Sequence, residues 1–229
     1  MNVWGIIFLL VLMPVVYAQQ LKVGIPDLEN ASKRRLMSEI DEIYPGKLIV
    51  SELPNQRSIQ NVVNGKQDFH YPVLLPLSNV KRSFDYSFSK VTIRRIVYAV
   101  YLNKANKEIG IHNLENYLIE GERGHVEFFD FDVVPSTCVE CSFKKLENSR
   151  IDGFIYPALE GDVLIKKLGL RNIDSLYFDT YESKFALPKN SRGEELNTLL
   201  SSIISKMKIS ERYLILNKAN KTWKPSRQQ

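Results

Sequence analysis

Two stretches of the chain follow the same order of residue types, and this repeat constrains the fold. They are residues 62–71 and 145–156, and each combines the end of a helix, a tight turn, an aspartate and a short apolar strand that ends in an aromatic residue. Gly65 can adopt the left-handed conformation that closes a helix, and Asn148 or Ser149 can do so less comfortably. A helix-to-strand connection used twice predicts two similar α/β lobes.

In open α/β folds, ligands bind beside the carboxyl ends of the strands. We therefore expect Tyr71 and Tyr156, which end the two repeated strands, to face one cleft between the lobes. The alternative is a chance repeat, because helix–turn–strand units recur in every α/β protein.

The N-terminal segment predicts export. Residues 1–18 contain no charged side chain, and residues 6–13 form an apolar run. Residues 16–18 suit the positions that a signal peptidase recognises, so we expect cleavage near Ala18 and a periplasmic or secreted protein. The alternative is a retained membrane anchor, although the run is shorter than the roughly 20 apolar residues that a spanning helix needs.

The net charge of +5 comes from Lys and Arg residues scattered along the chain. The sequence lacks the dense basic clusters with interleaved aromatic residues that are typical of a nucleic-acid groove. A mildly anionic small ligand suits this charge better than DNA. Residues 19–229 suffice for two lobes of about 100 residues each, and the lack of a Pro-, Gly- or Ser-rich linker predicts that structured strands join them.

Cys138 and Cys141 are the only cysteines in the sequence. In an oxidising compartment this pair predicts a disulfide, and a thioredoxin-like redox pair at the start of a helix is the alternative. His70, His112 and His125 are not at metal-ligand spacing with each other or with the cysteines. We expect no metal and no cofactor.

The order of apolar segments predicts a parallel sheet with helical crossovers. The apolar run at 95–102 predicts a strand that crosses between the lobes, and residues 183–188 predict the strand that returns. Ser191 and Glu194 form a capping-box pattern at the start of a C-terminal helix. The other expected elements are strands at 21–25, 48–50 and 126–131 and helices at 32–44, 58–64 and 114–119.

Residues 77–89 resemble the strand-exit segment of the bacterial extracellular solute-binding proteins of family 3, which are type 2 periplasmic binding proteins. In that family a Ser or Thr and then an Arg precede an aspartate or aromatic residue, a Phe-Ser pair and the crossover strand. The resemblance implies an α/β fold with two lobes, each a sheet flanked by helices, joined by two crossover strands. We expect one lobe to comprise residues 19–95 and 184–229 and the other residues 96–183.

The resemblance implies that Arg82 binds a ligand carboxylate, with Ser78 and Asp27 lining the same pocket. An Arg side chain suits this role because its rigid fork of donors matches an oxyanion. Tyr71 and Tyr156 would then supply flat apolar walls. The alternative is that Arg82 is an exposed loop residue or braces Asp85.

The sequence departs from the family in the second lobe. Amino-acid-binding members carry an acidic residue for the ligand ammonium where this chain has Pro157, and Glu160 or Asp162 would have to substitute. The family's Gly-Thr or Gly-Ser turn is also missing, and Ser136 and Thr137 are the nearby residues with that chemistry. These departures disfavour an ordinary α-amino acid as the ligand.

Taken with the export signal, the resemblance predicts a monomeric solute-binding protein that holds a small polar or anionic ligand between two lobes. An ABC-type uptake system with a membrane permease is the expected context, and a sensor kinase is the other partner considered. Two alternatives stay open. One is an enzyme on the same scaffold, such as a dehydratase or a hydrolase, although the three histidines form no pattern of a catalytic triad. The other is an orphan sensor or signalling protein.

Overall fold

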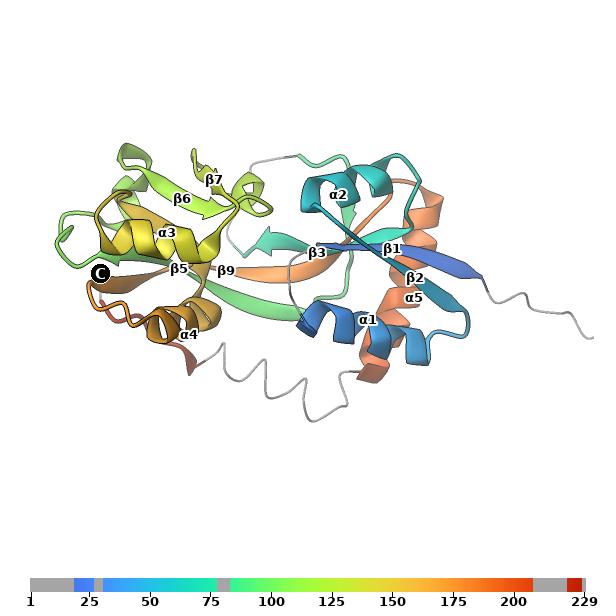
Figure 1. Cartoon of the computed structure of the whole chain (residues 1–229). Coiled ribbons are helices and arrows are strands. Elements are labelled where there is room, and N and C mark those ends of the chain that lie inside the picture. The colour runs from blue at the N-terminus through green and yellow to red at the C-terminus, as the bar shows by residue number, and fades with distance from the viewer. Residues whose placement is uncertain (1–18, 27–30, 78–82, 208–221, 228–229) are drawn as a thin grey trace, which may run out of the picture.

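Strand pairing runs without interruption through the part of the chain that the structure describes. This computed structural model describes residues 19–26, 31–77, 83–207 and 222–227 (Figure 1). Within these residues the sheet has nine strands in the order β2-β1-β3-β9-β5-β8-β6-β7, and β4 pairs with β9. In chain order the elements are β1 (Gln20–Pro26), α1 (Ala31–Ile43), β2 (Lys47–Leu53), α2 (Asn55–Val63), β3 (Phe69–Pro76), β4 (Ser87–Phe88), β5 (Arg94–Asn103), the 3-10 helix η1 (Ile111–Asn116), β6 (Ile119–Glu122), the 3-10 helix η2 (Val126–Phe128), β7 (Val134–Ser136), α3 (Val139–Glu147), β8 (Gly153–Pro157), α4 (Ala158–Leu168), β9 (Ile173–Leu187) and α5 (Ser191–Met207).

The two ends of the sheet repeat one arrangement. At one end β1 lies between β2 and β3, and at the other β6 lies between β7 and β8, with all four pairings parallel. Figure 1 shows α1, α2 and α5 around the first set of strands and α3 and α4 beside the second set. We call these the first and the second lobe. The predicted two-lobed α/β architecture is confirmed.

The turns of the two repeats match in atomic detail. Gly65 has a φ of +69° after α2, and Ser149 has a φ of +52° after α3. An aspartate follows each turn and accepts a backbone hydrogen bond. Asp68 accepts from Lys22 N in β1 at 2.8 Å, and Asp152 accepts from Leu118 N, directly before β6, at 2.9 Å. Each aspartate therefore fixes its own strand beside β1 or β6, which explains why both repeats contain it.

Two long strands join the lobes. β5 pairs antiparallel with β9 along its whole length, from Arg94 opposite Ser183 to Asn103 opposite Ile173. β9 also pairs with β3 of the first lobe, and β5 pairs with β8 of the second. The apolar run at 95–102 thus forms the expected bridging strand, and the predicted return strand is longer than expected because it begins at Ile173.

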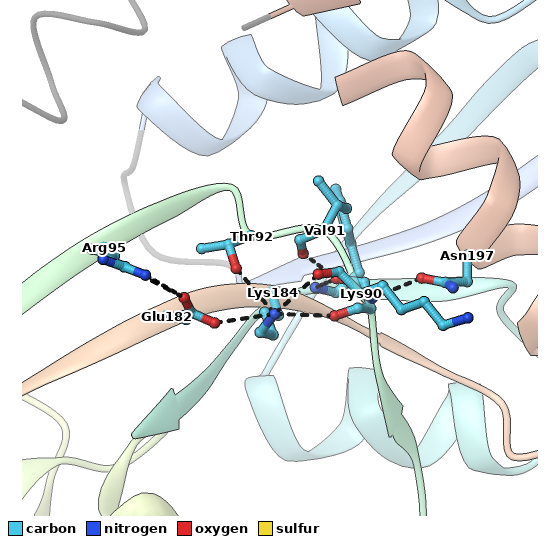
Figure 2. A network of polar contacts seen from close by, with 9 residues as sticks. Lys90, Val91, Thr92, Arg95, Glu182, Lys184 and Asn197 are labelled. Carbon is cyan, nitrogen blue, oxygen red and sulfur yellow. Dashed lines mark hydrogen bonds and ion pairs between the residues drawn. The ribbon is translucent and has the colours of Figure 1, made fainter. Parts of the chain in front are cut away.

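A buried lysine of β9 binds the segment that directly precedes β5 (Figure 2). The side chain of Lys184 is 7% exposed, and its Nζ lies 3.2 Å from Glu182 Oε2. The same Nζ donates to Ser89 O at 3.2 Å and to Thr92 Oγ1 at 3.0 Å. Glu182 in turn contacts Arg95 at 3.3 Å. The ammonium satisfies oxygens of two neighbouring segments, so their relative position is fixed where the chain leaves the first lobe.

Each lobe has its own apolar core, and a third cluster combines residues of both lobes. The first lobe buries residues such as Ile40 and Leu200, and the second buries Phe143 and Phe154. The third cluster extends from β3 through β5 to the segment after η2 and includes Tyr98. In the described part of the chain, no helix is both long and apolar enough to cross a bilayer.

Three local predictions were wrong. Residues 114–119 do not form a helix, because η1 ends at Asn116 and Ile119 already belongs to β6. Residues 126–131 do not form a strand: η2 lets the consecutive Phe128 and Phe129 both enter the core, whereas a strand would direct them to opposite faces.

The third error concerns the cap of α5. The Oδ1 of Asn190 accepts from Gly193 N at 3.2 Å, so Asn190 and not Ser191 caps the helix. The predicted helix itself is present, and it packs on α1 in the core of the first lobe.

Candidate ligand-binding cleft

A cavity of about 340 Å³ lies between the lobes, where strands of both repeats end. The end of β1 and the start of α2 line it from the first lobe, and the segment after β6 and the turn between β7 and α3 line it from the second. Ligand sites of α/β folds are usually found at such strand ends. The lining residues are Pro26, Pro54, Asn55, Gln56, Glu122, Arg123, Gly124, His125, Ser136, Thr137 and Val139.

The two lobes touch beside this cavity. Asn55 Nδ2 at the start of α2 donates to Gly124 O in the second lobe at 2.6 Å. A Cβ at Gly124 would lie 3.1 Å from the Cβ of Asn55, so a glycine permits this close approach. Asn55 Oδ1 is buried and has no hydrogen-bond partner among the described residues.

Glu122 at the end of β6 is held by a histidine. His125 Nδ1 lies 3.1 Å from Glu122 Oε2, and the hydroxyl of Tyr98 lies 3.2 Å from the same nitrogen. Burial alone would raise the pKa of the Glu122 carboxyl, but His125 and the ammonium of Lys33 outweigh burial and lower it. Glu122 is therefore a carboxylate at neutral pH.

Lys33 on α1 belongs to the same group of charges although it comes from the first lobe. Only 9% of the residue is exposed. Burial lowers the pKa of its ammonium from the usual 10.5; Glu122 and Glu160 act against this effect, and Arg94 adds to it. Lys33 thus lies within electrostatic range of two second-lobe carboxylates.

Arg94 and Glu160 form a loose pair across the start of β5. Arg94 Nη1 lies 3.6 Å from Glu160 Oε1, and the guanidinium also contacts the hydroxyl of Tyr71. Asp162 is the other predicted substitute for the acidic residue that the family carries at the position of Pro157. It accepts instead from Tyr101 OH at 2.9 Å and from Trp223 Nε1 at 2.7 Å. Glu160 is therefore the one of these two acids that belongs to the charge cluster.

The two predicted aromatic residues lie near this cluster. Tyr71 is buried, and its hydroxyl accepts from Ser183 Oγ at 2.9 Å. Tyr156 is half-buried and stacks on Phe154, with ring centroids 5.5 Å apart. Burial and the nearby Glu122 and Glu160 raise the pKa of Tyr156.

Ser136 and Thr137 line the cavity. Ser136 Oγ lies 2.7 Å from Ser142 Oγ and accepts from Cys138 N at 3.3 Å, so it braces the start of α3, whereas Thr137 is exposed. The other three predicted ligand-binding residues, Asp27, Ser78 and Arg82, lie outside the described residues.

The predicted disulfide is present at the second-lobe edge of the cavity. Cys138 and Cys141 are joined with a Cα–Cα distance of 5.2 Å. Cys138 is the N-cap of α3, and its Sγ accepts from Cys141 N at 3.2 Å. The bond closes the first turn of the helix directly after Ser136 and Thr137.

Sequence reasoning missed Lys33, Asn55 and Glu122. A signal existed for Lys33, because it precedes Leu36 by three residues and Ile40 by seven, which places a lysine on the apolar face of α1. Asn55 and Glu122 carry no local pattern, since only the folding of the chain brings α2 and β6 together. Among the described residues, no cluster of His, Cys, Asp and Glu could hold a metal ion.

No protein-family model and no curated protein sequence matches the chain. Solved structures do match. A histidine kinase sensor domain with similarity to periplasmic binding proteins has a TM-score of 0.68 at 12% identity, with 89% of this chain and 96% of that chain covered. The substrate-binding protein of an ABC uptake transporter from Streptococcus pneumoniae, solved with bound histidine, has a TM-score of 0.65 at 10% identity, with 91% and 95% covered.

A third similar structure is an ancestral amino-acid-binding protein that is a precursor of cyclohexadienyl dehydratase. Its TM-score is 0.63 at 14% identity, with 88% of this chain and 95% of that chain covered. The matches span nearly the whole of each chain, whereas the identities are low. The chain therefore has the two-lobed fold of type 2 periplasmic binding proteins, and the similarity extends to the fold alone.

Proposed function

We propose that this protein is an exported binding protein that captures a small polar or anionic ligand between its two lobes. The observation that carries the proposal is the cavity at the facing strand ends, which residues of both lobes line, with Asn55 and Gln56 from the first lobe and the charged Glu122 and Arg123 from the second. Closure of two lobes on a ligand, by a hinge in the connecting strands, suits this arrangement. The proposed lobes are residues 19–95 with 184–229 and residues 96–183.

We assign Arg82, Ser78 and Asp27 to the same site, with Arg82 orienting the anionic end of the ligand. The resemblance of residues 77–89 to the solute-binding family supports this assignment, as does the match of Arg geometry to oxyanions. Ser136 and Thr137, which line the cavity, offer hydrogen bonds from the second lobe. Tyr71 and Tyr156 keep their assignment as apolar walls of the site, although neither is among the residues that line the cavity.

The proposed context is the periplasm or the exterior, after cleavage near Ala18, where the protein acts as a monomer and delivers its ligand to an ABC-type permease. The similar substrate-binding protein of an uptake transporter supports this context. The similar sensor domain supports a histidine kinase as the alternative partner.

An enzyme is the second candidate function. The observation that favours it is the Glu122–His125 pair in the cleft, because a carboxylate and an imidazole 3.1 Å apart can transfer a proton. The similar precursor of a dehydratase lends it further support.

A thermal-shift screen of the mature chain tests the proposal. The panel consists of the proteinogenic amino acids, C3–C6 dicarboxylates, hexoses, polyamines, inorganic phosphate and sulfate. We expect at least one compound to raise Tm, because a ligand that binds only the folded state stabilises it by mass action, and mass spectrometry should recover that compound unchanged. A chemically altered compound would establish the enzyme instead. A Tm that no compound changes would contradict ligand capture.

A further inference from the structure

The disulfide between Cys138 and Cys141 connects no distant parts of the chain. It joins the N-cap of α3 to a residue of the first helical turn, three positions later. A disulfide that restricts the unfolded chain stabilises the fold more when it closes a longer loop, so this bond contributes little in that way. Neither cysteine belongs to any of the three apolar clusters. The packing of the lobes therefore does not depend on the bond.

The two cysteines have different surroundings. Cys141 is exposed, whereas Cys138 is half-buried. The Sγ of Cys138 accepts a hydrogen bond from Cys141 N at 3.2 Å, at the N-terminus of α3. A helix N-terminus stabilises negative charge, and it lowers the pKa of a thiol that lies there. Cys138 is therefore placed to hold a thiolate, and Cys141 is placed to meet a reagent from solvent.

The acids near this turn are paired with lysines. Glu140, in the first turn of α3, lies 3.4 Å from Lys167 Nζ of α4. Glu120 of β6 lies 2.7 Å from Lys145 Nζ of α3. Each lysine offsets the repulsion that its acid exerts on a thiolate at Cys138. The titratable and charged residues that line the neighbouring cavity are Glu122, Arg123 and His125.

We propose that Cys138 and Cys141 form a thiol–disulfide exchange site, which an external dithiol reduces reversibly in the folded protein. A thiolate of the dithiol bonds to Cys141 Sγ while the bond between the two cysteines breaks, and its electron pair leaves with Cys138 as a thiolate. The second thiol of the reagent then displaces Cys141 and passes its proton to it. The dithiol is oxidised to a disulfide, and the protein accepts two electrons.

The positions of the two sulfurs decide which bond forms. Exchange favours attack on a sulfur that solvent can reach and release of the thiol with the lower pKa. Cys141 meets the first condition and Cys138 the second. The reduced protein keeps the cap of α3, because the Cys138 thiolate can still accept from Cys141 N. The site adjoins the cavity, since Thr137 and Val139 flank Cys138 and both line it. The inference does not depend on the proposed function.

The first test measures reduction of the native protein. The wild-type chain is incubated with dithiothreitol at neutral pH without denaturant, quenched with N-ethylmaleimide and weighed intact. We expect two maleimide adducts with an unchanged circular dichroism spectrum, and oxidised dithiothreitol should restore the bond. A bond that resists dithiothreitol until urea unfolds the chain would overturn the proposal.

The second test identifies the roles of the two sulfurs. Cys141→Ser leaves Cys138 alone and Cys138→Ser leaves Cys141 alone, so each variant is the matched control of the other, and circular dichroism checks that both are folded. The rate of alkylation by iodoacetamide, followed against pH, gives the pKa of each thiol. We expect the pKa of Cys138 to lie about one unit or more below that of Cys141, which should stay near the usual value of about 8.5. Equal values, or a lower value for Cys141, would overturn the assignment of Cys138 as the thiolate that leaves.

Discussion

At the scale of single residues, His70 links burial to acid stability. The ring is fully buried in β3, with Nδ1 2.8 Å from Ser58 Oγ and Nε2 3.2 Å from Pro72 O. Because a carbonyl can only accept, Nε2 donates to Pro72 O. Burial lowers the pKa of His70 from 6.5 to about 3.

This pKa predicts a loss of stability in acid. Between pH 6.5 and about 3 the unfolded chain binds more protons at His70 than the folded chain, so the free energy of unfolding falls as the pH falls through this window. The full effect is on the order of 5 kcal/mol, because each pKa unit corresponds to about 1.4 kcal/mol. Urea unfolding from pH 7.5 to 4 should give a shallower pH dependence for His70→Gln than for the wild type. His112→Gln, at an exposed position, is the control, and parallel curves for all three proteins would refute the assignment.

The residues of the cleft were only partly predictable. Ser136 and Thr137 were found because a family pattern and a nearby turn pointed to them, and the structure places both on the cavity wall. Glu122 and Asn55 were missed, because their positions depend on long-range pairing between segments that are distant in sequence. Local patterns carry no information on that pairing.

At the scale of elements, the repeated helix–turn–strand units were predictable because each depends on local chemistry. A left-handed turn residue and an aspartate that accepts a backbone hydrogen bond leave a recognisable pattern in the sequence. Residues 104–133 were not predictable in the same way. Apart from β6, their apolar side chains pack from short 3-10 turns and loops, whose spacing matches neither the helical nor the strand period.

The disulfide is an element-scale prediction, because it closes the first turn of α3. Cys138→Ser with Cys141→Ser should lower the free energy of unfolding by about 2 kcal/mol or less, since the closed loop is short. Chemical denaturation of the double variant measures this loss. Intact-mass analysis of the wild type, purified without reductant from the cell envelope or medium, should show no free thiol and a chain that begins at Gln19. Two free thiols would contradict the disulfide in the native protein.

At the scale of the whole molecule, β5 and β9 are both the continuous centre of the sheet and the connection between the lobes. Lys184 and Glu182 fix the first-lobe end of this connection, whereas Asn55 and Gly124 touch across the cleft through one hydrogen bond. The connecting strands are held by continuous pairing, whereas a single hydrogen bond is described here across the cavity. This arrangement suits a molecule that opens and closes at the cavity. The lobe-to-lobe connection was predictable from the apolar run at 95–102, because that run contains no turn residue.

The central claim is that the protein binds a small polar or anionic ligand between its lobes, and calorimetry on Arg82→Ala tests it most directly. The titrant is the compound with the largest thermal shift in the screen, and Arg171→Ala is the control because Arg171 is exposed. Removing a desolvated, charge-assisted contact should weaken binding by about 30-fold or more, on the order of 2 kcal/mol. The account predicts this loss in Arg82→Ala with an unchanged fold and no loss in Arg171→Ala. Equal affinities of the two variants would contradict it.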